Sequence, residues 1–310
     1  MVDPVLKWAG GKRRLLDEIY AHFPEEDSSS ATTTYHEPFF GGGALFFDLE
    51  PTAATINDTN SRLMNFYRQI RDNPEKVLKR ASKFRDPHKS PDPERPFAEE
   101  VEEKRDANWY YYQQRRLFNN PPDEEPFDEI EEAAILLYLN RTCFNGLYRE
   151  NRDGEFNVPV GRYSEPNWER ADLVREASRV LQESTVEIFD ESFEYVLDEA
   201  TAGDLVYFDP PYTPMSTTAE FTEYSKEGFG QRDQATLLSV ARELHEMDAY
   251  VILSNSGVMA PHYEDEGFTV TIEGAKRYIN SDGENRGEVD EILATNVPEI
   301  EAQLSPSLAR

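Results

Sequence analysis

The sequence predicts an α/β fold with a mainly parallel sheet, because three patterns favour it. Residues 35–58 have the pattern of a strand, a glycine-rich turn, a helix over 44–49 and a second strand, which is a β-α-β unit. The apolar runs Leu205–Phe208 and Tyr250–Leu253 are typical of buried parallel strands. A helical pattern over 233–245 lies between them, so strands and helices alternate again in the last third of the chain.

The middle of the chain has a different character, which predicts an inserted domain. Helical patterns over 63–70 and 130–139 flank a charged stretch that contains many prolines. We therefore expect one domain made of residues 1–64 and 166–310. A mainly helical domain of residues 65–165 is expected to be inserted into it.

The composition limits the class of protein. The chain has 310 residues, of which 38% are hydrophobic, so it can bury a core and full disorder is excluded. Its single cysteine, Cys143, excludes an internal disulfide and a thiolate metal cluster, and we expect no bound metal. No apolar run reaches the roughly 18 residues needed to cross a bilayer, and no secretion signal is visible. We expect a cytoplasmic protein without a membrane partner.

Acidic residues greatly outnumber basic ones. The chain has 61 Asp and Glu against 32 Lys and Arg, which gives a formal net charge of −29. Such a charge repels polyanions at ordinary ionic strength and by itself argues against nucleic acid as a partner. The alternative is adaptation to a very salty cytoplasm, where the screening length falls to about 3 Å at 1 M salt and net charge no longer governs partners. We favour this halophile hypothesis.

The motif Asp209-Pro210-Pro211-Tyr212 directly follows the predicted strand that ends at Phe208. It is therefore expected at the carboxyl edge of a parallel sheet, where open α/β folds bind ligands. The two prolines fix the backbone and remove two N–H donors, which leaves carbonyl oxygens beside a carboxylate and an aromatic ring. This set suits an exocyclic amine on a flat base that stacks against Tyr212. The alternative is a rigid turn that only ends the strand.

A glycine turn, Gly41-Gly42-Gly43, follows the first predicted strand. Glycines permit a sharp turn and the close approach of a ligand to the backbone. The turn is neither a G-x-G-x-x-G dinucleotide fingerprint nor a P-loop. Asp58 ends the next strand, where an acid accepts hydrogen bonds from ribose hydroxyls. Capping of the helix that begins near Ser61 is the alternative role for Asp58.

The segment Lys7–Lys12 combines two lysines and a tryptophan with a flexible Gly-Gly pair. This combination suits the wrapping of an adenosine or of a sulfonium-bearing ligand through cation–π contacts. An ordinary basic loop near the N-terminus is the alternative.

Taken in order, these motifs resemble those of the Dam-type (D12 class) DNA adenine-N6 methyltransferases. Residues 140–149 with 154–163, and residues 221–224, strengthen the resemblance. The similarity in pattern covers residues 5–295, and the stretch 80–130 is the least matched part.

The resemblance implies a Rossmann-like sheet that binds S-adenosylmethionine, with the inserted domain as the DNA target-recognition domain and the rest as the catalytic domain. Trp8 and Lys12 would contact the methionine part of the cofactor, and Asp58 would hold its ribose hydroxyls. Ser192 and Phe193 are candidates for the adenine edge of the cofactor. The implied cofactor set is Trp8, Lys12, Phe39, Gly41, Gly43, Asp58 and Asp209.

The implied reaction is direct methyl transfer to N6 of an adenine that is flipped out of duplex DNA. Asp209 and the Pro210 carbonyl would accept hydrogen bonds from N6, and Tyr212 would stack on the base. The closest alternative is cytosine-N4 methylation, which uses the same amine geometry. A non-catalytic DNA-binding modification subunit is another alternative. Cytosine-C5 chemistry needs a cysteine nucleophile, and Cys143 has no Pro-Cys context.

The resemblance also assigns DNA contacts to the loop that follows the second middle helix. Phe144 and Leu147 suit apolar insertion into the base stack, and Asn145 suits polar reading of bases. Arg149 would grip a guanine through O6 and N7, at the outer G of a GATC-like site. Arg162 belongs to the same locally basic loop, whose alternative is a solvated loop with balanced charges.

The expected partner is double-stranded DNA, and a cognate restriction endonuclease is a further candidate. We expect a monomer that works at the nucleoid.

The halophile hypothesis predicts that the free energy of unfolding rises with KCl concentration. Screening of the acidic surface relieves the repulsion that a charge of −29 causes. Chemical unfolding in about 0.1 M and about 2 M KCl measures this, and equal stability in both would contradict the hypothesis.

Overall fold

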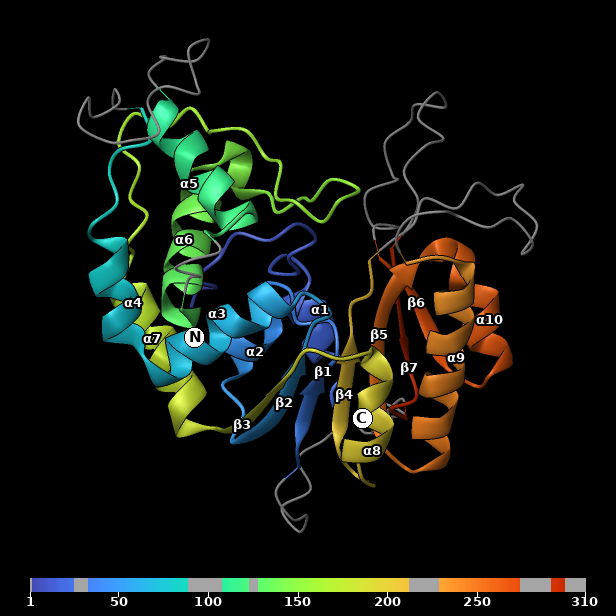
Figure 1. Cartoon of the computed structure of the whole chain (residues 1–310). Helices are drawn as coiled ribbons and strands as arrows, with labels where there is room; N and C mark the ends of the chain where they lie inside the picture. Colours follow the sequence, from blue (N-terminus) through green and yellow to red (C-terminus); the bar gives the residue numbers. More distant parts are fainter. Residues whose placement is uncertain are drawn as a thin grey trace, which may run out of the picture. The chain divides into compact units, whose positions relative to one another are not determined.

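Parallel strands and the helices between them form two structural units in the computed structural model of the chain (Figure 1). The first unit consists of residues 1–16 and 34–196, and the second consists of residues 17–33 and 197–310. The structure describes residues 2–24, 33–88, 108–122, 128–211, 229–273 and 291–298.

The first unit contains a three-stranded parallel sheet with β2 in the middle. Strand β1 (Tyr35–Glu37) pairs with β2 (Ala53–Asn57), and β2 pairs with β3 (Thr185–Phe189). Helix α2 (Ala44–Leu49) connects β1 to β2, so the predicted strand, turn, helix and strand over 35–58 are confirmed. The longer helices of this unit are α3 (Ser61–Asp72), α4 (Pro74–Ala81), α5 (Trp109–Asn119), α6 (Glu129–Thr142) and α7 (Ala171–Glu183).

Helix α6 is the centre of the helical part of the first unit. It begins after Asp128, whose side chain accepts a hydrogen bond from the Glu131 N–H (2.7 Å), and its first turn is acidic. Residues 133–140 are all buried, because α3, α4 and α5 pack around this helix. The helices predicted over 63–70 and 130–139 are confirmed as parts of α3 and α6.

The second unit contains a mixed sheet. Strand β4 (Leu205–Phe208) is parallel to β5 (Tyr250–Ser256), and β7 (Glu291–Thr295) runs antiparallel to both β5 and β6 (Thr269–Glu273). The sequence predicted β4, β5 and the helix between them, but not the antiparallel pair. The described α-helices that lie wholly or mostly in this unit are α1 (Leu16–Tyr20), α8 (Val196–Glu199), α9 (Gln231–Glu246) and α10 (Ala260–Asp265).

The predicted α/β class is therefore confirmed. The predicted domains are defined by function: a catalytic domain of residues 1–64 and 166–310, and an inserted domain of residues 65–165. This division stays a prediction. No helix of the described ranges is long and apolar enough to span a membrane.

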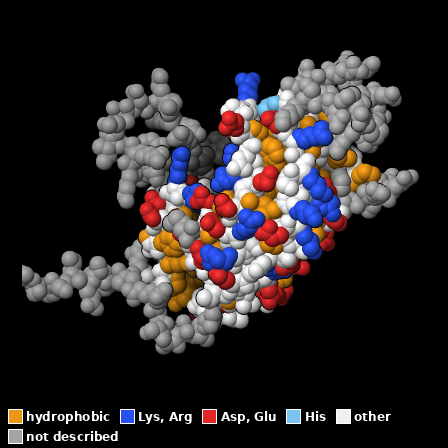
Figure 2. All heavy atoms as spheres, turned by 90° about the vertical axis from the view of Figure 1, so that its left-hand side faces the viewer, with side chains coloured by type: hydrophobic (Ala, Val, Ile, Leu, Met, Phe, Trp, Pro, Cys, Tyr) orange, Lys and Arg blue, Asp and Glu red, His pale blue; other side chains and the backbone are white. Residues whose placement is uncertain are grey.

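Acidic and basic side chains are interspersed on the face shown in Figure 2. The ion pairs of the described residues include Arg175 with Glu75 (2.6 Å) and Arg179 with Glu50 (3.0 Å). The hydrogen bond from Arg175 lowers the pKa of the Glu75 carboxyl. Such exposed pairs contribute little individually and are screened by salt.

Candidate active site and nucleic-acid interface

The turn after β1 requires glycine at two positions. Gly41 (φ +48°) and Gly43 (φ +67°) have left-handed backbone conformations. A Cβ on Gly41 would lie 2.8 Å from the Trp8 ring, and a Cβ on Gly43 would lie 2.5 Å from the Phe40 ring. The turn is therefore packed tightly against Trp8, and the structure brings together two residues of the predicted cofactor set.

The Asp58 carboxylate lies against this turn. It accepts hydrogen bonds from the Gly41 N–H (3.1 Å) and from the Asn60 N–H (2.9 Å). Burial raises the pKa of Asp58, while these two N–H groups lower it. The helix-capping alternative for Asp58 is wrong, because Asn60 caps α3 through the Leu63 N–H (3.1 Å). The carboxylate retains acceptor capacity for hydroxyl groups.

One buried side chain, Asn57, joins the ends of all three strands of the first unit. Its amide NH₂ donates to the Pro38 carbonyl and to the Glu191 carbonyl (3.1 Å each), and its carbonyl oxygen accepts from the Glu191 N–H (2.8 Å). The rings of Phe39 and Phe193, one from each of the joined loops, lie 5.2 Å apart. A carboxylate, an aromatic wall and a glycine turn thus share one edge, which suits a flat ligand that carries hydroxyl groups.

The segment before α1 contributes two further candidates. Lys12 is buried, with 7% of its surface exposed. Trp8 is half-buried and stacks on Tyr148 (centroids 5.0 Å apart, planes at 23°). Lys7 donates to the Tyr163 hydroxyl (3.2 Å).

In the second unit, Asp209 and Pro210 follow the fully buried strand β4, as predicted. Asp209 is half-buried, Pro210 is buried, and Tyr212 lies outside the described residues. The neighbouring end of β5 is polar: Ser254 hydrogen-bonds to Tyr207 (3.0 Å), and Asn255 donates to Gln234 and Tyr263. This is the carboxyl edge of a parallel pair, where acceptors can hold an amine.

The loop after α6 begins with a tight turn, residues 144–147, which we call the recognition turn. Its central residues Asn145 (φ +55°) and Gly146 (φ +68°) are both left-handed, and the Leu147 N–H donates to the Phe144 carbonyl (3.2 Å). Phe144 and Leu147 are 46% and 38% exposed. Two apolar side chains and one amide therefore face solvent together, which suits contact with stacked bases.

Arg149 is exposed and held in place by its neighbours. Its Nε donates to Asn157 Oδ1 (2.6 Å), and the Asn157 N–H donates to the Arg149 carbonyl (3.0 Å). Neither Arg149 nor the exposed Arg162 pairs with a carboxylate among the residues whose placement is described. Their guanidinium groups are available to an anion or to a base edge.

Cys143 is buried, and burial raises the pKa of its thiol to about 12. A thiol with so high a pKa is a poor nucleophile at neutral pH, which argues against cysteine-based chemistry. Within the described ranges, no group of three or more His, Cys, Asp or Glu is arranged to hold a metal ion.

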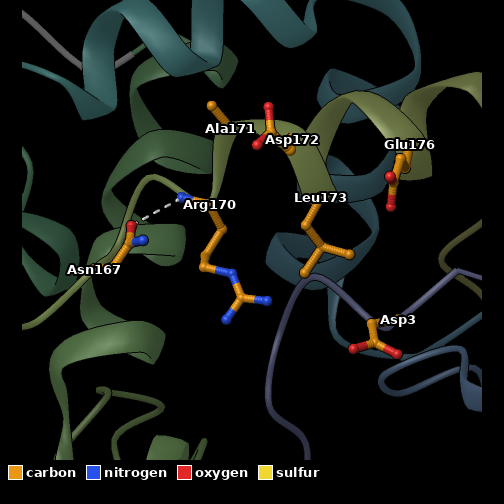
Figure 3. Close-up of a pocket in the computed structure, with 7 residues that line it drawn as sticks. All are labelled: Asp3, Asn167, Arg170, Ala171, Asp172, Leu173 and Glu176. Atoms are coloured by element: carbon orange, nitrogen blue, oxygen red, sulfur yellow. Dashed lines mark hydrogen bonds between the residues drawn. The ribbon is translucent and has the colours of Figure 1, made fainter.

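A hollow at the start of α7 contains none of the predicted site residues. Figure 3 shows the Arg170 side chain extending from this helix start, with its backbone N–H bonded to Asn167 (3.3 Å). Asp3, Asp172 and Glu176 also line the hollow. Its mixed charges do not form a set suited to one ligand.

Two residues near the predicted sites received no role from the sequence. Tyr148 stacks on Trp8, and Asn140 bonds to the backbone of Lys7. The Asn145-Gly146 dipeptide is a turn signal that was available in the sequence. Asn140 begins the stretch 140–149 that strengthens the resemblance, but its position in the buried helix α6 gave no indication of a role in the site.

The α/β fold and the groups that follow its strands suit an enzyme that binds a nucleoside cofactor. The sequence matches the D12 class N6 adenine-specific DNA methyltransferase family over residues 8–291. The chain belongs to this family and is an adenine-specific DNA methyltransferase, as the resemblance predicted.

Relatives agree with this assignment. The chain is 37% identical over 293 residues to the type II methyltransferase M1.LlaDCHI of Lactococcus lactis subsp. cremoris, covering 94% of this chain and 95% of that protein. It is 37% identical over 303 residues to the type II methyltransferase M.MjaIII of Methanocaldococcus jannaschii, covering 95% and 99%. It is 34% identical over 296 residues to the DNA adenine methylase of Escherichia coli K12, covering 95% of each. Adenine methylation is thereby favoured over the cytosine and non-catalytic alternatives.

Replacement of Gly41 by Ala is expected to lower methyl transfer to DNA at least about tenfold, because the new Cβ displaces Trp8. Gly267→Ala is the matched control: Gly267 also has a positive φ (+87°), but nothing lies within 4 Å of its added Cβ. Initial rates with duplex DNA measure both variants. Equal losses would show that backbone strain, and not the contact with Trp8, determines the effect.

Proposed function

We propose that the chain transfers the methyl group of S-adenosylmethionine to N6 of an adenine flipped out of a GATC-like site in duplex DNA. The contact of the Asp58 carboxylate with the Gly41 turn is the observation that supports the cofactor assignment most directly. When bound, S-adenosylmethionine supplies an electrophilic methyl group on a sulfonium.

The edge of the first unit fits such a cofactor. Asp58 would accept hydrogen bonds from the ribose hydroxyls, and Phe39 and Phe193 would border the adenine, with Ser192 at its edge. Trp8 packs directly against the Gly41 turn, so the turn and the indole ring would both border the cofactor. Trp8 and Lys12 would hold the methionine part.

The edge of the second unit fits the target amine. Asp209 and the carbonyl of Pro210 would accept the two hydrogens of N6, which orients the nitrogen lone pair toward the methyl group. The Asp209 carboxylate would also stabilise the positive charge that develops on N6. Tyr212 would stack on the flipped base and offset part of the cost of extrusion. Direct displacement needs no covalent enzyme intermediate.

The loop after α6 would provide the DNA contacts. Phe144 and Leu147 are the exposed apolar positions of the recognition turn and would enter the base stack. Asn145 and Arg149 would read base edges, while Arg162 would contribute to phosphate binding.

The enzyme would act as a monomer on DNA in the cytoplasm, at the nucleoid. The names of the two type II relatives support a cognate restriction endonuclease as a functional partner.

Transfer of labelled methyl groups from S-adenosylmethionine to duplex DNA tests the proposal. Asp209→Ala is expected to lower the rate at least about 100-fold, because the amine loses its orienting acceptor. Asp265→Ala removes an exposed acid of α10 and is expected to retain the wild-type rate. Label on cytosine N4, or a rate unchanged by Asp209→Ala, would contradict the proposal.

Arg149→Ala is expected to relax discrimination at one base pair by about 1–3 kcal/mol, because one bidentate base contact is lost. Competition between duplexes that differ at single positions measures this selectivity. Arg152→Ala removes an equal charge from the same exposed loop and should leave the selectivity intact. Undiminished selectivity in Arg149→Ala would remove the assignment.

A further inference from the structure

The buried Asn140 side chain joins two segments that have different proposed tasks. It is fully buried, accepts a hydrogen bond from the Lys7 N–H (2.9 Å) and donates one to the Lys7 carbonyl (2.8 Å). Its second N–H donates to the carbonyl of Gly146 in the recognition turn (3.2 Å). The amide thus pairs with the Lys7 backbone in both directions and holds the turn at the same time.

Side-chain packing strengthens this connection. A Cβ on Gly146 would lie 2.3 Å from the Lys7 side chain, so the turn sits directly on Lys7. Trp8, the residue after Lys7, stacks on Tyr148, which lies two residues after Gly146. Trp8 also packs against Gly41, and Gly41 belongs to the turn at the proposed cofactor edge. A continuous path of contacts therefore runs from the Gly41 turn to the recognition turn.

From these contacts we propose that Asn140 is a positioning residue that couples cofactor binding to DNA binding. This inference rests on the proposed function of the two segments. Ordering of the Lys7–Trp8 backbone by the cofactor also orders the recognition turn, because the Asn140 amide fixes both. The coupling is reciprocal: DNA on the turn raises the affinity for the cofactor by the same factor.

Only an amide can fill this role at position 140. One acceptor and two donors are required, and all three are used. Asp would lose both donors and place a buried charge beside two carbonyls, and an apolar side chain would leave the Lys7 backbone groups unpaired.

Asn119 offers a matched control. Its amide also pairs with a backbone in both directions, donating to the Phe156 carbonyl (2.9 Å) and accepting from the Phe156 N–H (2.9 Å). It therefore supports the later part of the same loop through an equivalent interaction. These two hydrogen bonds to Phe156 involve neither Lys7 nor the recognition turn.

The test is calorimetric titration of S-adenosylhomocysteine into the full-length protein, with and without a duplex built on the site that methylation mapping identifies. The wild-type affinity should rise at least about fivefold with DNA, a usual size of coupling. The ratio of the affinity with DNA to the affinity without DNA should fall below about twofold in Asn140→Ala. It should stay near the wild-type value in Asn119→Ala.

Three results would overturn the inference: binding of both ligands by the wild type without coupling, an undiminished ratio in Asn140→Ala, or an equal loss in Asn119→Ala. Failure of the wild type to bind S-adenosylhomocysteine would instead overturn the proposed function, and the inference with it.

Hydrogen exchange on the wild type gives a test that does not depend on the folding of a variant. S-adenosylhomocysteine alone should slow exchange in a peptide covering residues 140–148, and unchanged exchange would contradict the coupling.

Discussion

The proposed cofactor edge depends on the hydrogen bonds of the Asn57 side chain. Parallel strands place their carboxyl ends together, but the loops that leave them must still be held in one arrangement. Asn57 does this by bonding to Pro38 after β1 and to Glu191 after β3. Asp58, the next residue, then reaches the Gly41 turn. Asn57 and Asp58 together therefore connect the loops after β1 and β3 with the Gly41 turn.

Neutral amides make the connections within the functional parts, whereas ion pairs lie on the surface. Asn57, Asn119 and Asn140 each bind a backbone segment through both amide atoms. Such bonds are buried or partly buried and carry no net charge, so salt screens them little. Exposed pairs such as Arg175 with Glu75 are screened strongly. A chain of net charge −29 that works in concentrated salt would gain from this division, since these three backbone connections do not depend on screened interactions.

The sequence was sufficient for the parts of the fold that local chemistry determines. The turn after β1 was predictable because positive φ values there demand glycine, and the helices α3 and α6 were predictable from apolar spacing. The antiparallel strands β6 and β7 were missed because their pairing depends on distant segments. The role of Asn140 was missed for the same reason: its partner Lys7 lies 133 positions away, and the stretch 140–149 does not indicate which of its residues pairs with that segment. The capping role considered for Asp58 failed because Asn60, two residues later, is better placed to cap α3.

A crystal structure of the full-length protein with S-adenosylhomocysteine would show where the nucleoside binds. Both ribose hydroxyls should lie within hydrogen-bond distance of the Asp58 carboxylate, and the adenine should be bordered by Phe39 and Phe193. A nucleoside bound away from Asp58, for instance in the hollow beside Arg170, would contradict this placement.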